Sequence, residues 1–252
     1  MNKIKLFGKN SIGSWLQMPN RYSAEIMAKS GFDWLAIDME HGLIDVQKAF
    51  ELIQVVELAG SIPLVRLNEN NPSLIRRVMD AGAKGVIVPM VNTAEDAQKA
   101  VDAVKYPPDG KRSYGLGRAH EFGKNFSEYI KTINTESIVV VQIEHINAFL
   151  NLDSILGVKS IDAIIIGPYD LSGSMGIAGK FDDDKFQEAV NKIIEKVKKH
   201  NIALGIHIVH PSLDDLKQRV SQGFSFIGFG MDTIFLSDGC AKAIKECRKI
   251  IK

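Results

Sequence analysis

Short apolar runs rich in β-branched residues alternate with amphipathic stretches along the whole chain, and this alternation restricts the fold more than any other feature. The apolar runs number eight and are typical of strands: 12–17, 34–39, 62–67, 85–90, 138–143, 161–166, 203–209 and 224–230. Helical patterns follow them at 23–29, 45–59, 72–81, 93–104, 146–156, 182–198, 212–222 and 234–251. Eight strand–helix units spaced by about 30 residues predict an α/β fold of the (β/α)8 TIM-barrel type.

An open, doubly wound sheet is the competing fold for such an alternation. The chain has neither Gly-x-Gly-x-x-Gly after its first strand nor a Walker phosphate loop, so the usual nucleotide-binding open sheets are disfavoured. No Ser/Pro-rich linker divides the sequence, and we therefore expect one domain over residues 1–252. Helix boundary signals agree with the assignment, with starts at Asn71 and Thr93 and stops at Gly31, Gly60, Gly82 and Gly223.

Two insertions interrupt the regular spacing, at 106–126 and at 167–180. Long irregular segments in a compact fold are usually lids or binding loops. The first insertion precedes the fifth strand on the far side of a helix, so topology places it at the amino-terminal end of the barrel. A solvated excursion is the alternative interpretation of that segment.

Composition restricts the function more than the fold. The 31 basic and 30 acidic residues nearly cancel, so no broad positive field exists to hold nucleic acid, and 45% hydrophobic residues exclude wholesale disorder. No run approaches the roughly 20 apolar residues of a membrane span, and no signal-type segment starts the chain. Cys240 and Cys247 lie two turns apart on one predicted helix and cannot pair. We expect a cytoplasmic protein acting on small molecules.

Polar residues gather where the predicted strands end, which is where barrel enzymes carry their chemistry. The second strand closes with Asp38, Glu40 and His41, and the third with Arg66. The fifth ends in Gln142-Ile-Glu144-His145, and the sixth runs into Gly167-Pro-Tyr-Asp170. Because side chains alternate along a strand, Asp38 and Glu40 share one face, whereas His145 faces away from Glu144. Salt bridges that merely cap the barrel are the structural alternative.

Glu144 and Asp170 come from neighbouring strands about 5 Å apart, so both carboxylates can meet one ion. Oxygen ligands with open positions suit a hard divalent cation, Mg²⁺ or Mn²⁺. Arg66 supplies fixed donors for an oxygen that gains negative charge, and His41, with Asp38 available to set its tautomer, can move a proton near neutral pH. Carbon–carbon bond cleavage or formation beside a ketone fits this set.

Two other chemistries fit less well. Schiff-base aldol chemistry needs a desolvated lysine inside the barrel, but Lys84 precedes the fourth strand and so lies at the opposite mouth. A glycosidase could use Glu144 and Asp170 as its pair of carboxylates, although Arg66 and His41 would then have no role.

The residues resemble those of the HpcH/HpaI aldolase family, the metal-dependent pyruvate aldolases that act on 4-hydroxy-2-oxo acids. Matching motifs include Ile12-Gly-Ser-Trp15, Gly31-Phe-Asp-Trp-Leu-Ala-Ile-Asp-Met-Glu-His-Gly42, Pro63-Leu-Val-Arg66, Val88-Pro-Met-Val91, Tyr106-Pro-Pro-Asp-Gly-Lys-Arg112, Val141-Gln-Ile-Glu144 and Ile166-Gly-Pro-Tyr-Asp-Leu-Ser172. The similarity extends from about residue 12 to 236, in the family's order and spacing.

The resemblance implies a TIM barrel whose last helix is often exchanged between subunits of a dimer, and a homo-oligomer that is commonly a hexamer of three dimers. It implies a divalent cation, Mg²⁺ or Mn²⁺ with Co²⁺ as a further option, held by Glu144 and Asp170. His41 with Asp38 would be the acid–base dyad, Arg66 would polarise the ketone oxygen, and Glu40 would hold metal-bound water. Substrate-binding positions would be Trp15, Gln142, Tyr169, and the backbone around Gly167, Pro168 and Leu171, with the amides placed for the pyruvate carboxylate.

The expected reaction cleaves the C3–C4 bond of a 4-hydroxy-2-oxo acid, of the 2-keto-3-deoxy sugar acid or heptanedioate type, to pyruvate enolate and an aldehyde. Two alternatives remain: an acyl-CoA lyase like the citrate lyases, and a barrel that binds metabolites without catalysis. Departures from the family pattern at Tyr169 and His207, and at Tyr114, Leu116, Arg118 and His210, indicate a reshaped pocket and a polar, sugar-derived aldehyde. Packing is the other explanation for Tyr169 and His207.

Overall fold

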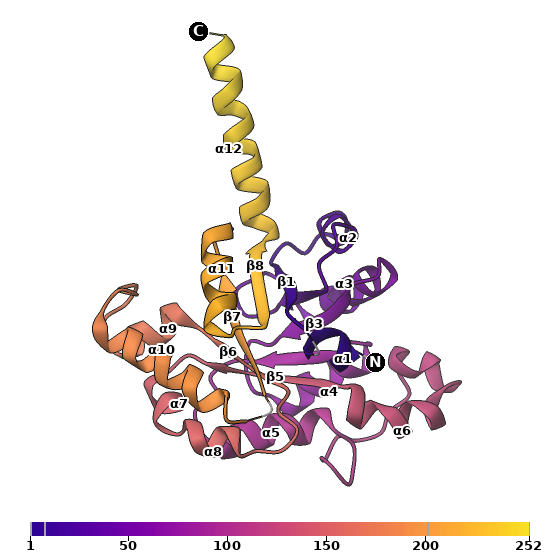
Figure 1. Cartoon of the computed structure of the whole chain (residues 1–252). Helices are drawn as coiled ribbons and strands as arrows, with labels where there is room; N and C mark the ends of the chain where they lie inside the picture. Colours follow the sequence, from indigo (N-terminus) through magenta and orange to yellow (C-terminus); the bar gives the residue numbers. More distant parts are fainter. Residues whose placement is uncertain (1, 8, 201, 252) are drawn as a thin grey trace.

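The computed structural model describes residues 2–7, 9–200 and 202–251. Its strands form one closed barrel in which each strand pairs in parallel with the next and β8 pairs with β1 (Figure 1). The strands are β1 (Ser11–Leu16), β2 (Trp34–Asp38), β3 (Ile62–Arg66), β4 (Gly85–Val88), β5 (Ile138–Ile143), β6 (Ala163–Ile166), β7 (Ala203–Ile208) and β8 (Phe226–Met231). The (β/α)8 prediction is confirmed, and the open sheet is excluded.

Helices cover the outside of this barrel. They are α1 (Asn2–Phe7), α2 (Arg21–Lys29), α3 (Val46–Leu58), α4 (Pro72–Asp80), α5 (Ala94–Val104), α6 (Phe126–Glu136), α7 (Ile146–Leu150), α8 (Leu152–Leu156), α9 (Pro168–Ser174), α10 (Asp184–Val197), α11 (Leu213–Gln222) and α12 (Asp232–Ile250), with a 3₁₀ segment η1 (Arg118–Gly123). The sequence patterns did not predict α1, α6, α9 or η1. Elsewhere the predicted ends differ by at most two residues, and the helix predicted over 146–156 is divided into α7 and α8.

The predicted helix boundaries are made by local hydrogen bonds. Asn71 accepts the backbone N–H groups of Ser73 and Leu74, and Thr93 forms a capping box with Asp96. The predicted glycine stops all have positive φ, from 94° at Gly60 to 109° at Gly82, a conformation that favours glycine. The strand β4 ends at Val88 because the backbone of Met90 turns into the left-handed region, with φ 52°.

Two apolar clusters divide the core. Inward-facing side chains of the strands, among them Trp34, Leu64, Val140 and Phe226, fill the amino-terminal part of the barrel together with Leu6 of α1. The outward-facing strand residues pack against the helices in a second, larger cluster. Since the apolar filling occupies the amino-terminal part, the inward positions at the carboxyl ends of the strands are left to polar residues.

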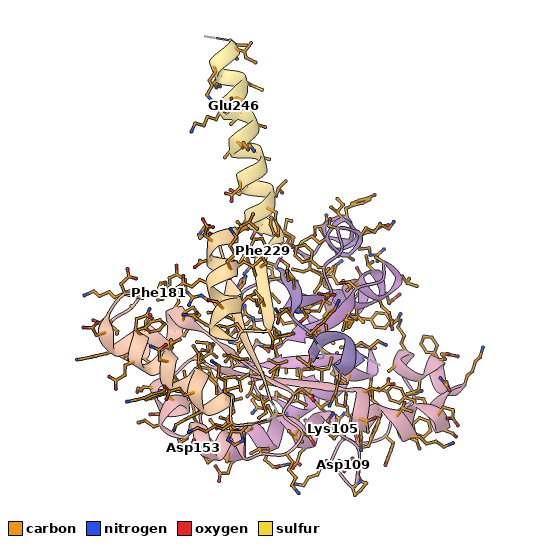
Figure 2. The ribbon with its side chains drawn as sticks, in the orientation of Figure 1. Lys105, Asp109, Asp153, Phe181, Phe229 and Glu246 are labelled. Atoms are coloured by element: carbon orange, nitrogen blue, oxygen red, sulfur yellow. The ribbon has the colours of Figure 1, made fainter. Side chains whose placement is uncertain are left out.

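The insertion after α5 packs on the amino-terminal end of the barrel, as topology predicts. Arg112 donates to Asp80 at the end of α4, and Arg118 pairs with Glu57 at 2.6 Å. Lys105 lies in this region, away from Phe229 of β8 in Figure 2. The segment is an ordered cover for that end and takes no part in the opposite mouth.

The last helix, α12, leaves the barrel as a single projecting rod (Figure 1). All of its side chains from Leu236 to Ile250 are exposed, and Glu246 stands well clear of the other helices in Figure 2. Cys240 and Cys247 on it are free thiols, as predicted. In the part of the chain that the structure describes, no helix combines the length and apolarity needed to cross a bilayer.

Candidate active site

The predicted site residues meet at the carboxyl end of the barrel around a cavity of about 190 Å³. The lining includes Trp15, His41, Arg66, Gln142, Glu144, Gly167, Pro168, Tyr169 and Asp170. Asp38 and Glu40 contact Arg66 from behind and do not line the cavity. Four strands therefore bring their terminal polar residues to one place, as the alternation of side chains predicted.

Arg66 is the central cation of this site and is only 8% exposed. Its Nε and Nη2 donate to the two carboxylate oxygens of Asp38 at 2.9 and 2.6 Å, a bidentate pair. Its Nη1 lies 2.9 Å from Glu40 Oε2. These two carboxylates fix the plane of the guanidinium, so its position at the cavity is set before any substrate arrives.

Glu144 is held as firmly, by neutral donors. Its Oε1 accepts the backbone N–H of Met90 at 2.6 Å, and its Oε2 accepts the Gln142 amide at 2.5 Å. The left-handed backbone of Met90 turns this N–H toward the carboxylate. Gln142, predicted to bind substrate, is thus also a positioning residue for Glu144.

Negative charge exceeds positive charge around the cavity. Glu40 interacts electrostatically with Arg66, Glu144, Asp38 and Asp170, which makes four carboxylates around one guanidinium. Burial raises the pKa of Glu40 to about 7, against the attraction of Arg66. Burial also raises the pKa of Glu144, and Asp170 adds to the rise. Because the acidic groups of this site outnumber its one guanidinium, the site favours the binding of a further cation.

Asp38 has different partners from those predicted. Besides Arg66 and the amide of Gln17, its carboxylate accepts the backbone N–H groups of Glu40 and His41, both at 3.1 Å. Among the described contacts none joins Asp38 to the His41 ring, which is exposed at the rim. Asp38 therefore orients His41 through its main chain, because both carboxylate oxygens of Asp38 already accept hydrogen bonds from Arg66.

The backbone amides predicted to bind the pyruvate carboxylate are used within the fold. The Gly167 N–H donates to the Ile143 carbonyl at 3.2 Å, and the Leu171 N–H donates to the Gly167 carbonyl at 2.9 Å. Leu171 itself is buried in the outer core. The Gly167 N–H therefore extends the pairing of β6 with β5, and the Leu171 N–H closes the first turn of α9, while the assignment of this backbone region to the pyruvate carboxylate stays a prediction.

Sequence reasoning missed Gln17, which lines the cavity. Its side-chain amide donates to Asp38 at 3.1 Å, and its backbone N–H donates to Asp232 at the start of α12. Gln17 thus links the base of α12 to the Asp38–Arg66 pair. Its position two residues beyond the inward-facing Trp15, on the same face of the strand, was the signal available in the sequence.

The donor set fits a hard divalent cation. Glu144 and Asp170 present oxygen ligands at the cavity, and the surrounding excess of carboxylates favours a dication. The described residues contain no group of three or more His, Cys, Asp or Glu side chains arranged to hold a metal. That Glu144 and Asp170 hold the ion stays a prediction, in which the remaining coordination positions would be open to substrate oxygens.

Comparison with known proteins agrees with this geometry. Residues 11–238 match the family described as HpcH/HpaI aldolase/citrate lyase. The chain belongs to this family. It is 39% identical over 234 residues to the 4-hydroxy-2-oxo-heptane-1,7-dioate aldolase of Salmonella typhimurium, covering 92% of this chain and 88% of the relative.

Two solved structures of the family share the fold over nearly the full length. The HpcH/HpaI aldolase of Desulfitobacterium hafniense is 30% identical with a TM-score of 0.91, covering 98% of this chain and 96% of that one. A family protein from Burkholderia cenocepacia is 29% identical with a TM-score of 0.92, covering 98% of each chain. The TIM barrel and the family assignment therefore stand on sequence and structure together.

Proposed function

We propose that this aldolase-family protein reversibly cleaves a 4-hydroxy-2-oxo acid to pyruvate and an aldehyde. The observation that carries the proposal is the charge arrangement at the catalytic end of the barrel: Glu144, Asp170 and the immobilised Arg66 line one cavity, and Asp38 and Glu40 hold the guanidinium. The Salmonella relative is named for this type of reaction. Cleavage beside a ketone generates an enolate, and an enolate needs a fixed positive environment.

Glu144 and Asp170 would hold the cation, Mg²⁺ or Mn²⁺. When bound, such an ion polarises the ketone and shares the negative charge of the enolate. Gln142 and the Met90 amide keep the Glu144 carboxylate pointing into the cavity. Glu40, which lies 2.9 Å from Arg66 Nη1, would hold water near these two carboxylates.

Arg66 would donate to the ketone oxygen as it becomes anionic. The bidentate contact with Asp38 prevents the guanidinium from swinging away, so no reorganisation is needed during bond cleavage. His41, at the rim, would take the proton of the 4-hydroxyl group and return it in the synthetic direction. Trp15, which is buried, contributes an aromatic ring to the cavity lining.

The projecting α12 supports an assembly in which this helix packs on a second copy. Leu236, Ile244 and Ile250 on α12 are more than half exposed. Tyr22 and Ile26 on α2 are also exposed, and α11 has no buried residue, so the helices on either side of β8 leave an apolar face uncovered. An exchanged α12 would cover that face, and we propose a dimer-based homo-oligomer, up to a hexamer.

The free, exposed thiols of Cys240 and Cys247 are compatible with a reducing compartment, and we propose a cytoplasmic location.

The proposal is tested by assaying pyruvate release from a racemic 4-hydroxy-2-oxo acid with purified protein. EDTA should abolish the release and Mn²⁺ or Mg²⁺ should restore it. A full rate in EDTA with borohydride trapping of pyruvate would instead indicate Schiff-base chemistry. Absence of release at any metal concentration, with intact metal binding, would indicate a non-catalytic barrel.

A further inference from the structure

His207 lies inside the active-site cavity, at a position to which the proposed reaction assigns no task. It occupies an inward-facing position of β7 and lines the cavity together with Trp15, Tyr169 and Met231. The rings of His207 and Trp15 are stacked, with centroids 4.4 Å apart and planes at 10°. Gly228 makes the stack possible, since a Cβ there would lie 2.3 Å from the Trp15 ring. The imidazole therefore has one fixed orientation.

The hydrogen bond at Nε2 sets the tautomer. Nε2 lies 3.0 Å from the Gly230 carbonyl oxygen, which can only accept, so Nε2 carries the proton and Nδ1 carries the lone pair. Burial lowers the pKa of His207 to about 4, and the imidazole is neutral at neutral pH. The ring is thus a donor toward β8 and an acceptor at its other nitrogen.

Nδ1 faces open space. Within the described residues it has no hydrogen-bond partner, and it is not among the buried side-chain atoms that lack one. The Nε2 and Cδ2 edge of the ring faces Gly230 and Gly228 of β8, so the Nδ1 edge faces the β6 side. There the cavity adjoins a second one of about 180 Å³, and the two share His207, Ile166, Pro168, Tyr169 and Val209.

The cavity lining next to His207 includes the uncharged side chains of Trp15, Val209 and Met231, and the charges of Arg66 and Asp38 also act on the imidazole. A fixed neutral acceptor at this place discriminates by hydrogen bonding, because a ligand group without a donor leaves it unpaired.

We propose that His207 determines substrate specificity by accepting a hydrogen bond from a hydroxyl group on the aldehyde half of the substrate. The inference rests on the proposed aldolase function and narrows it. Aldehydes with a hydroxyl near the reacting carbon are favoured over their deoxy counterparts. Cleavage of the heptane-1,7-dioate substrate named for the Salmonella relative would give an aldehyde that ends in a carboxylate. A carboxylate has only hydrogen-bond acceptors, so it forms no hydrogen bond with the Nδ1 lone pair.

The test measures kcat/KM in the aldol direction with pyruvate and Mn²⁺, using matched aldehydes. The pairs are glycolaldehyde with acetaldehyde and glyceraldehyde with propanal, and succinic semialdehyde is the carboxylate-ended probe. Wild-type protein should prefer the hydroxylated member of each pair by about tenfold. His207→Leu should bring both ratios to about one with the KM for pyruvate unchanged, as should His207→Phe, which keeps an aromatic ring against Trp15.

His210→Leu is the matched control, since His210 follows the same strand but lines only the second cavity. This variant should keep the wild-type ratios. A wild-type protein with no preference for hydroxylated aldehydes, or His207 variants that retain it, would overturn the inference. Failure of the proposed function is distinguishable, because the wild-type protein would then form no aldol product from any aldehyde.

Discussion

The two ends of the barrel both bury cations but use them differently. At the amino-terminal end Lys105 is fully buried, and its ammonium donates to the carbonyl oxygens of Asn134 and Ser137 and to the Ser137 hydroxyl at 2.6 to 2.8 Å. Arg112 is 2% exposed, pairs with Asp80 and packs over the ring of Tyr106. Arg112 there is paired with a carboxylate and Lys105 with three neutral acceptors, and both side chains are closed off from solvent.

At the carboxyl end the acidic groups outnumber the basic ones. Arg66 is also buried and also paired with an aspartate, but Glu40, Glu144 and Asp170 lie around it beside an open cavity. A buried pair that satisfies itself contributes to structure, whereas an excess of one charge at a cavity requires a ligand. The difference shows that a buried ion pair alone does not indicate function. Function is indicated by further charged groups that lie next to such a pair and have no partner of opposite charge.

The largest expected effect separates the two buried arginines. Arg66→Lys should lower turnover about 100- to 1,000-fold, nearly as much as Arg66→Ala, because an ammonium cannot bond Asp38 bidentately and reach the ketone oxygen at once. Arg112→Lys is the control, since Arg112 is also buried and also donates to an aspartate, Asp80, and this variant should lose stability and keep its turnover. Steady-state kinetics with circular dichroism measure both. Near-normal turnover in Arg66→Lys would contradict the role assigned to Arg66.

The next effect concerns the cation. Saturating Mn²⁺ at about 100 times its dissociation constant should raise the melting temperature of the wild-type protein by about 5 °C. Glu144→Gln should abolish the rise, because the amide removes a ligand charge. Glu57→Gln, a carboxylate paired with Lys84 and Arg118 at the opposite end, should keep it. Differential scanning calorimetry with and without Mn²⁺ checks the difference, and an equal shift in both variants would refute the assignment.

The third effect concerns stability at the amino-terminal end. Lys105→Met should lower the free energy of unfolding by about 2 kcal/mol without changing kcat, because three acceptors lose their donor. Burial lowers the pKa of Lys105 to about 7, against about 10.4 in the unfolded chain.

The unfolded state therefore binds more protons than the folded state between these two values, so Lys105 makes the unfolding free energy rise with pH from about 7 to 10. Urea denaturation of wild type and Lys105→Met at pH 7 and pH 9 measures this contribution. The variant should have the smaller rise, and an identical rise in both proteins would show that Lys105 does not titrate in this range.

The smallest effect concerns the link behind Arg66. Gln17→Leu removes the hydrogen bond to Asp38 and should lower kcat/KM about fivefold. Gln98→Leu breaks a comparable amide–carboxylate bond, to Asp102 on the surface of α5, and should have no effect on catalysis. If both variants behave like wild type, Gln17 has no part in positioning Arg66.

Much of this arrangement could be read from the sequence because the signals are local. Alternating apolar runs predicted eight strands, and the two-residue repeat predicted that Asp38, Arg66, Gln142 and Glu144 face the barrel interior. The placement of the 106–126 insertion followed from its position after a helix. The motifs around these residues were enough to indicate the family.

What the sequence by itself determined was therefore which residues face inward and at which end of the barrel. The tertiary structure alone decided the partners: Arg66 and not the His41 ring for the Asp38 carboxylate, the Gly167 carbonyl for the Leu171 amide, and the Gly230 carbonyl for His207. It also showed that α12 stands free of its own barrel. The physical reason is that the direction of a side chain, into or out of the barrel, is set by the two-residue repeat of its own strand. Hydrogen-bond partners depend instead on distances between strands that lie far apart in the sequence and meet only when the barrel closes.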